Sequence, residues 1–151
     1  MSNLSLDGLY NYEVTKITFN PKEGTLRGTF VLFSWFISGD YIIEGNIAQI
    51  PLKGQGRAET NLSRTDCEIQ ITNNQNNCDN LEVKLFMKIS DLTGYLTGIL
   101  NEDLTNILIN SLSGTVAAEI SPVWGKILES IIKSYLQTSC KKVFINDLFL
   151  V

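Results

Sequence analysis

The sequence contains no histidine among its 151 residues. Histidine is the usual general base near neutral pH, the partner of nucleophilic serine and cysteine, and the commonest ligand of transition metals. Without it, acid–base chemistry would rest on carboxylate pairs such as Glu102 with Asp103, or Asp40 with Glu44. A helix start and the solvated edge of a strand explain these pairs more simply. We therefore expect a protein that is not an enzyme and that needs no cofactor.

Motifs for binding phosphate or metal are also lacking. Gly54-Gln55-Gly56 is followed neither by the Lys-Ser/Thr of a P-loop nor by a complete Gly-x-Gly-x-x-Gly. Ten residues separate Cys67 from Cys78, and no second pair of ligands accompanies them, so no metal site is expected. A net charge of −4 leaves little positive potential, which disfavours nucleic acid and anionic lipid surfaces as partners.

The sequence has no apolar run of the length that a transmembrane helix needs. The best candidate, residues 123–135, is interrupted by Lys126, Glu129 and Lys133. Residues 1–20 lack a basic segment followed by an apolar one, so no secretory signal peptide is visible. If the protein is secreted, its signal has been removed or lies outside this sequence.

What is present fits a single domain over residues 1–151, with 44% hydrophobic residues and 19% charged residues. In the first two thirds, apolar residues recur with the period of two that is typical of strands. We predict a bulge near Thr15 and Lys16. The predicted strands cover residues 10–19, 25–37, 40–50, 55–72, 81–89 and 92–100.

From Asn101 onward the apolar spacing changes to three and four residues. This spacing predicts a short helix that breaks at Ser113-Gly114, followed by a long helix. Pro122 either starts a new helix after Ser121 or kinks a continuous one. Several strands followed by helices indicate the α+β class.

The segment from Gly39 to Gly56 joins an alternating strand to regularly spaced glycines. Four of its residues share one face of the strand, namely Tyr41, Ile43, Gly45 and Ile47. The glycines mark places where the sheet bends or another backbone approaches closely, and they stand at Gly39, Gly45, Gly54 and Gly56. Such a sheet is expected to curl around something.

This spacing resembles that of the takeout and haemolymph juvenile-hormone-binding family of arthropod proteins. The shared pattern is Gly-x-Tyr-x-Ile-x-Gly-x-Ile over residues 39–47, then Ile-Pro-Leu-x-Gly-x-Gly over residues 50–56. Two further segments fit the family in the same order: Leu6-x-Gly8-Leu9 leading to Val14 and Phe19-Asn20-Pro21, and a long helix that closes on Asp147-Leu148-Phe149.

The resemblance implies a TULIP-like lipid-binding fold, in which a strongly curved antiparallel β-sheet wraps around a long C-terminal α-helix. It also implies an apolar tunnel between helix and sheet, and favours a kink at Pro122. Family members usually carry a signal peptide, a cysteine pair and an opening helix ahead of the position of Asn3. We therefore expect this chain to lack a counterpart of that region and to correspond to the C-terminal two thirds of the usual family chain.

Large apolar and aromatic side chains on the predicted strands and long helix are the candidates for the tunnel lining. For any single residue of this kind, packing in the hydrophobic core is a sufficient explanation. For the residues taken together, the resemblance favours contact with a ligand. The candidate ligand-binding residues are Phe30, Leu32, Trp35, Tyr41, Ile43, Leu85, Met87, Ile89, Trp124, Leu128, Ile131 and Tyr135. Among them Tyr41, Trp35 and Tyr135 carry polar tips that could orient an oxygen of the ligand.

Three cysteines leave at least one unpaired within a monomer. Cys67 and Cys78 flank the polar segment 69–77, and a hairpin there would bring them within disulfide distance. The alternative is that all three are buried free thiols. Under both interpretations Cys140 stays free.

These observations predict a soluble, extracellular (secreted) carrier of a small hydrophobic ligand, such as a juvenile-hormone-like terpenoid, a fatty acid or another lipid. The alternative is a surface-acting protein, similar to lipopolysaccharide-binding or mite-allergen proteins, that recognises lipid assemblies or proteins without a small-molecule tunnel. If the missing opening helix leaves apolar surface exposed, a homodimer or a longer ligand would cover it.

Overall fold

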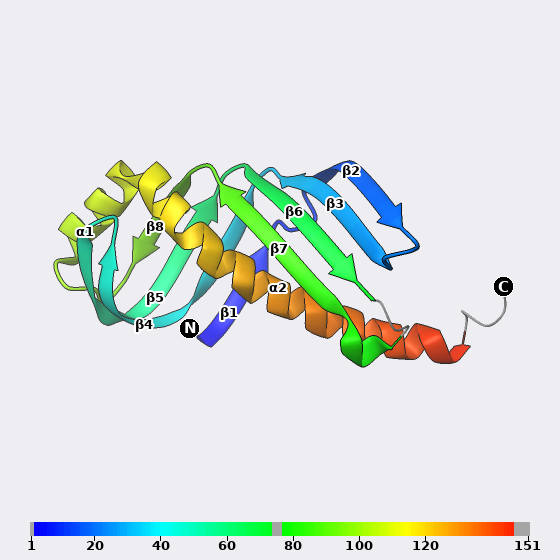
Figure 1. Cartoon of the computed structure of the whole chain (residues 1–151). Coiled ribbons are helices and arrows are strands. Elements are labelled where there is room, and N and C mark those ends of the chain that lie inside the picture. The colour runs from blue at the N-terminus through cyan, green and yellow to red at the C-terminus, as the bar shows by residue number, and fades with distance from the viewer. Residues whose placement is uncertain (1, 74–76, 147–151) are drawn as a thin grey trace.

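The computed structural model describes residues 2–73 and 77–146, with side chains up to Cys140 (Figure 1). The resembling segment Asp147-Leu148-Phe149 lies outside the described residues. In this part of the chain, strands precede two α-helices, which confirms the α+β class. The elements are β1 (Ser2–Asp7), β2 (Tyr12–Asn20), β3 (Thr25–Leu32), β4 (Trp35–Ile47), β5 (Ile50–Leu62), β6 (Thr65–Thr72), the 3-10 turn η1 (Cys78–Asn80), β7 (Glu82–Ile89), β8 (Leu92–Leu96), α1 (Glu102–Ser111) and α2 (Ser113–Asn146).

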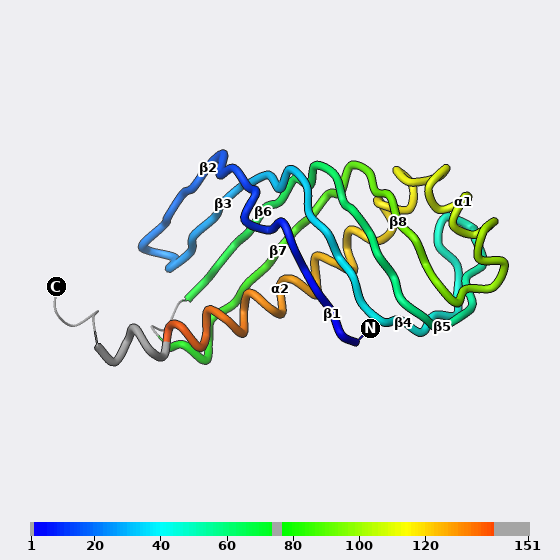
Figure 2. Tube along the Cα trace, turned by 180° about the vertical axis from the view of Figure 1, so that it is seen from behind, coloured from blue at the N-terminus to red at the C-terminus, as the bar shows by residue number. Residues whose placement is uncertain are grey.

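The strands form two four-stranded antiparallel sheets, sheet A in the order β1-β4-β5-β8 and sheet B in the order β2-β3-β6-β7. Each strand of sheet A is joined by a short break to the strand in the same position of sheet B. The two sheets are therefore halves of one sheet creased across its middle, and α2 runs diagonally along it (Figures 1 and 2). This arrangement confirms the predicted curved sheet around a long helix.

The crease passes through the dipeptides 33–34, 63–64 and 90–91, each of which contains a serine. Two backbone hydrogen bonds within the crease join the last two dipeptides, from Ser63 N to Asp91 O and from Ser90 N to Arg64 O, both 3.0 Å. The prediction of single strands over residues 25–37 and 55–72 is wrong, because the crease divides each of them. Apolar residues on both sides of a sharp bend look like one continuous strand in the sequence.

Trp35 packs beside this crease and is only 1% exposed. Its indole N–H donates a 2.9 Å hydrogen bond to the hydroxyl of Thr65, which satisfies both buried groups. Its ring meets the ring of Trp124 edge-on, with 6.3 Å between centroids. The two tryptophans therefore join the crease to the middle of α2.

A two-residue turn joins the long strands β4 and β5. Its residues Ala48 and Gln49 both have positive φ, as the twist of a tight hairpin requires. The bulge predicted near Thr15 is confirmed, because the register between β2 and β3 shifts between Val14 and Lys16. The predicted break before the long helix falls at Leu112, and α2 continues through Pro122, so no new helix starts after Ser121.

The glycine pattern of β5 has a steric cause. Residues 97–99, which follow β8, run so close beside β5 that a side chain on Gly56 would overlap the carbonyl of Thr97. A side chain on Gly54 would likewise lie 2.8 Å from the Cα of Ile99. The predicted close approach of another backbone is confirmed for these two glycines. Gly45 differs, since nothing lies within 4 Å of an added Cβ.

Side chains of α2 hydrogen-bond to the edge of sheet B. Ser121 accepts a bond from Ile89 N (3.0 Å) and Glu129 accepts one from Leu85 N (2.9 Å). Gly125 lies between them on the same helical row, and the absence of a side chain there lets the helix approach the backbone of Leu85. The helix thus takes the place of a missing strand next to β7.

Helix α1 does the same at the edge of sheet A. The Asn106 amide accepts from Leu96 N (2.8 Å) and donates to Leu96 O (2.9 Å). The Asn110 amide forms the equivalent pair with the N–H and C=O of Gly94, both at 2.8 Å. Asn106 and Asn110, one helical turn apart, therefore bond the free backbone N–H and C=O groups of Leu96 and Gly94, which are two residues apart on β8.

The disulfide joins Cys78 to Cys140, with 5.7 Å between their Cα atoms, and Cys67 is free and buried. The predicted pair Cys67–Cys78 and the predicted free Cys140 are both wrong. The register of β6 and β7 explains this, because it places Cys67 opposite Met87 within the sheet, whereas Cys78 lies in the loop that connects the two strands, beyond the pair Thr72–Glu82. Burial, and then the charge of Asp66, raise the pKa of the Cys67 thiol to about 12.

The first prediction concerns the close approach at Gly56. We expect Gly56→Ala to lower the free energy of unfolding by roughly 1–3 kcal/mol, because the new Cβ forces the backbone of Thr97 away. The matched control is Gly45→Ala in the same hairpin, which should be neutral or gain about 0.5 kcal/mol. Urea unfolding of both variants measures the difference, and equal losses would contradict the steric explanation.

The second prediction concerns the pH dependence of the contact between α2 and β7. The bond from Leu85 N holds the pKa of Glu129 below its ordinary value of 4.5. As pH falls, the unfolded chain takes up this proton first, so the stability given by the carboxylate is present above pH 4.5 and is lost as the pH drops through the folded pKa. Glu129→Gln should therefore be less stable than wild type at pH 7, and the gap should narrow below pH 4.5.

Thermal unfolding of both proteins as a function of pH measures this gap. The control is Ser121→Ala, which removes an uncharged acceptor from the same helical row. Its cost, about 1 kcal/mol, should not change with pH. A gap between Glu129→Gln and wild type that stays constant down to pH 3 would show that the carboxylate charge contributes nothing to this contact.

Candidate functional site

A largely apolar cavity of about 310 Å³ lies between sheet A and the first half of α2. Strands β4, β5 and β8 form its floor, α1 closes one end, and α2 covers it (Figure 1). Its lining residues are Ile37, Tyr41, Ile42, Ile43, Ile47, Leu52, Ala58, Thr60, Leu92, Gly94, Tyr95, Leu96, Ile109, Val116, Ile120, Val123, Trp124 and Ile127. The volume lies at the lower end of the range of small-molecule sites.

The cavity has a buried floor and an open mouth. Ile37, Leu52 and Leu92 on the three strands are almost fully buried. In contrast, Ile42 is 83% exposed and Val123 is 58% exposed, although both line the cavity. The exposed part of the lining therefore includes residues of both β4 and α2.

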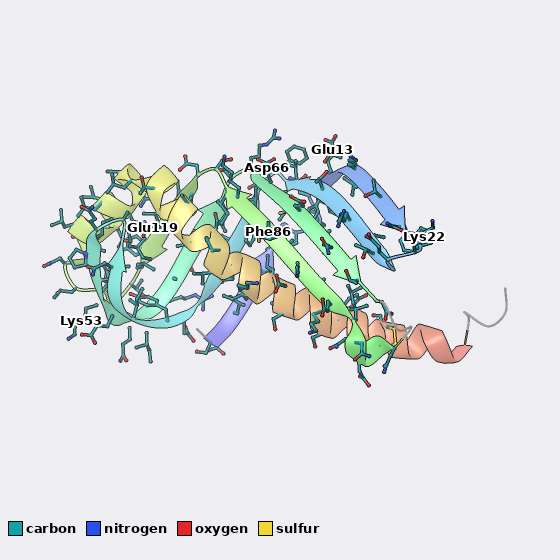
Figure 3. All side chains as sticks on the ribbon, in the orientation of Figure 1. Glu13, Lys22, Lys53, Asp66, Phe86 and Glu119 are labelled. Carbon is teal, nitrogen blue, oxygen red and sulfur yellow. A yellow bond between two sulfur atoms is a disulfide. The ribbon has the colours of Figure 1, made fainter. Side chains whose placement is uncertain are left out.

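The hairpin tip closes the cavity on another side. The backbone N–H of Ala48 donates a 2.8 Å hydrogen bond to the carboxylate of Glu119 on α2. Figure 3 shows Glu119 on the helix where the tip of the β4–β5 hairpin reaches it. The bond holds Ile47 over the cavity, and so the curl of the hairpin and the position of α2 are coupled.

Few polar groups reach the cavity. The hydroxyl of Tyr41 donates to Thr97 O at 2.6 Å, and burial, followed by the charge of Glu102, raises its pKa. The hydroxyl of Tyr95 donates to Glu102 at 2.7 Å, and this bond raises the pKa of Tyr95 and lowers that of Glu102. Among the described lining residues, this leaves the hydroxyl of Thr60 without a hydrogen-bond partner in the chain.

The structure distributes the predicted ligand-binding residues over three environments. Tyr41, Ile43 and Trp124 line the cavity. Seven others belong to the hydrophobic core or pack against it, namely Phe30, Leu32, Trp35, Leu85, Met87, Ile89 and Leu128. Ile131 and Tyr135 are exposed on the second half of α2. The cavity is thus confined to the half of the molecule that contains sheet A.

Several lining residues escaped the sequence reasoning, above all Ile37, Leu52, Ala58, Thr60, Ile109 and Val116. A signal was present for β5, where Leu52, Ala58, Thr60 and Leu62 share one parity and therefore one face. Small and polar residues at 58 and 60 weakened that alternation. These same small residues leave room for a cavity.

The described residues contain no group of three or more Cys, Asp or Glu side chains placed to hold a metal ion. None of the helices in the described ranges is both long enough and apolar enough to span a bilayer.

The fold and site together define a class: an α+β protein whose creased antiparallel sheet and long helix enclose an apolar cavity. The family model described as haemolymph juvenile hormone binding protein matches residues 1–150, and the chain belongs to this family. The predicted resemblance is confirmed. Membership places the chain with carriers of hydrophobic ligands, which are binding proteins.

Among solved structures, the crystal structure of Epiphyas postvittana Takeout 1 is similar, with a TM-score of 0.57 and 17% sequence identity. The similarity covers 95% of this chain and 67% of that chain, and at this identity it supports the fold alone. A comparison with curated proteins finds no match.

Proposed function

We propose that this chain carries a small hydrophobic ligand in the cavity between sheet A and α2 and shields it from water. The observation that carries the proposal is the cavity itself, about 310 Å³ with an almost wholly apolar lining and a mouth at Ile42 and Val123. Family membership supports it independently. No step requires a catalytic group.

The volume limits the part of a ligand that the cavity can enclose. At about 30 Å³ for each water-sized group, 310 Å³ holds roughly ten such groups. Burying about ten methylenes would contribute about 8 kcal/mol before the costs of association are subtracted. A short terpenoid or acyl chain fits inside, and a longer one, such as a juvenile-hormone-like terpenoid or a fatty acid, extends through the mouth.

We assign contacts with the apolar body of the ligand to Tyr41, Ile43 and Trp124. The hydroxyl of Thr60, which lacks a partner in the described chain, is the group that would meet a ligand oxygen. We also propose an extracellular location, which two observations support. The matching family is named for haemolymph, and the Cys78–Cys140 disulfide is typical of oxidising compartments.

The third prediction tests the cavity by filling it. Ala58 is buried and lines the cavity, so Ala58→Leu should place its added carbons where the ligand lies. Affinity for a fluorescent fatty acid, followed through the emission of the ligand, should fall at least about tenfold, or about 1.4 kcal/mol, without loss of thermal stability. The matched control is Ala118→Leu on the exposed face of α2, which should bind like wild type.

Organic extraction of the purified wild-type protein, followed by mass spectrometry, complements this titration. A co-purified lipid that disappears in Ala58→Leu identifies the ligand class. Wild type that is empty and binds neither fatty acids nor terpenoids would refute the carrier function.

The fourth prediction concerns the polar end of the ligand. Thr60→Val keeps the shape of the side chain and removes its hydroxyl. Binding of a terpenoid alcohol should weaken about fivefold, in line with the loss of one hydrogen bond of about 1 kcal/mol. Binding of the matching hydrocarbon should not change, and an equal loss for both ligands would place the ligand oxygen elsewhere.

A surface-acting recognition protein is the second candidate, and the exposed face of β2 favours it. All nine residues of β2 are exposed, including Tyr12, Ile17 and Phe19. If this surface carries the function, Ile17→Ser should abolish binding to lipid vesicles while Ala58→Leu leaves that binding intact. If the cavity carries the function, Ala58→Leu should weaken binding in the ligand titration and Ile17→Ser should leave it unchanged.

A further inference from the structure

Helix α1 presents its polar side to the protein and its apolar side to solvent. Thr105, Asn106 and Ile109 are buried, and two of these three are polar. The opposite side carries Leu104, Ile107 and Leu108 at the i, i+3, i+4 spacing that forms one helical face. With Leu100 before the helix and Leu112 after it, these exposed residues form what we call the outer stripe: Leu100, Leu104, Ile107, Leu108 and Leu112.

The hydrogen bonds of α1 explain why the stripe points outward. Asn106 and Asn110 must face β8 to bond its backbone, which rotates the leucines of the helix away from the sheet. Figure 1 shows α1 at the end of the molecule, beyond the edge of sheet A. Contiguous exposed aliphatic residues of this kind mark an interaction site more often than an ordinary surface.

We propose that the outer stripe binds the outer stripe of a second copy of this chain, with the two α1 helices antiparallel about a twofold axis near Ile107. Five aliphatic side chains expose on the order of 100 Å² each, so about 1,000 Å² would be buried between two copies. This area lies at the lower limit of specific interfaces and fits a weak dimer. Leu and Ile at spacings of three and four interdigitate in such helix pairs.

The charges around the stripe favour this partner over others. The sequence has no Lys or Arg between Lys88 and Lys126, and the acidic residues of α1, Glu102 and Asp103, both lie at its start. An antiparallel pair keeps the two acidic ends about 15 Å apart, which exceeds the screening length of about 8 Å at physiological salt. A parallel pair would place them side by side.

The same charges disfavour a lipid surface as the partner. Helices that lie on membranes combine Lys or Arg on the polar face with Trp or Phe on the apolar face. The outer stripe contains no aromatic residue and has no basic neighbour within α1.

Sedimentation velocity over a range of concentrations tests the dimer with the full chain. The wild-type mass should rise from 16.9 kDa toward twice that value, and Ile107→Glu should raise the dissociation constant at least about tenfold. The matched control is Ile17→Glu on β2, since Ile17 and Ile107 are both 62% exposed. Circular dichroism confirms that each variant is folded. A wild type that stays monomeric up to about 1 mM, or a dimer broken only by Ile17→Glu, overturns the proposal.

Cysteine cross-linking tests the antiparallel arrangement in a Cys67→Ala background. Ile107→Cys, near the twofold axis, should form a disulfide-linked dimer on mild oxidation. Leu100→Cys should not, although Leu100 at 63% and Ile107 at 62% are equally exposed. Cross-linking at both positions would indicate parallel helices and overturn the arrangement. Flotation of wild type, but not of Ile107→Glu, with uncharged phosphatidylcholine vesicles would overturn the protein partner in favour of lipid.

Discussion

The unpaired backbone groups at two sheet edges determine where both helices lie. Four residues of helix advance about 6 Å and two residues of strand advance about 6.6–6.8 Å, so a helical row can follow a strand edge almost in step. Ser121, Gly125 and Glu129 follow β7 in this way, and Asn106 with Asn110 follow β8. Because unpaired buried backbone groups are costly, these contacts fix both the position and the rotation of each helix.

The cavity is a consequence of that arrangement. Bonds from Ser121 and Glu129 to β7 anchor the first half of α2, and residues 116–127 of the same half line the cavity over sheet A. The glycines of β5 allow residues 97–99 to close the strand layer, and the hairpin tip is tied to Glu119. A ligand bound beneath α2 would contact elements whose relative positions are already set, so little ordering is needed on binding.

The sequence predicted features that depend on local pattern and failed where tertiary contacts decide. Alternation over residues 81–89 marked β7, and Gly54 and Gly56 marked the close approach of another backbone. The crease could not be recognised in the sequence. Each of its dipeptides contains one serine, and two residues inserted between apolar residues do not interrupt the alternation that marks a strand. Asn106 and Asn110 carried a usable signal, two amides one helical turn apart, but their partners are strand residues 10 and 16 positions earlier. Of the predicted ligand-binding residues, only Tyr41, Ile43 and Trp124 line the cavity. The alternation of a strand tells which face of the sheet a residue occupies, and it does not tell where the packing leaves a cavity.

The position of the disulfide has a consequence for oxidative maturation. The native pair closes a separation of 62 residues, whereas Cys67 and Cys78 are only 11 apart, so loop entropy in the unfolded chain favours the wrong pair by about 1.5 kcal/mol. Pairing of β6 with β7 reverses this preference, because it places Cys67 opposite Met87 and buries its thiol. Assembly of sheet B and the approach of α2 to η1 therefore favour the native pair over the local one. Oxidation before this assembly would favour the pair Cys67–Cys78, so the order of folding and oxidation decides which disulfide predominates.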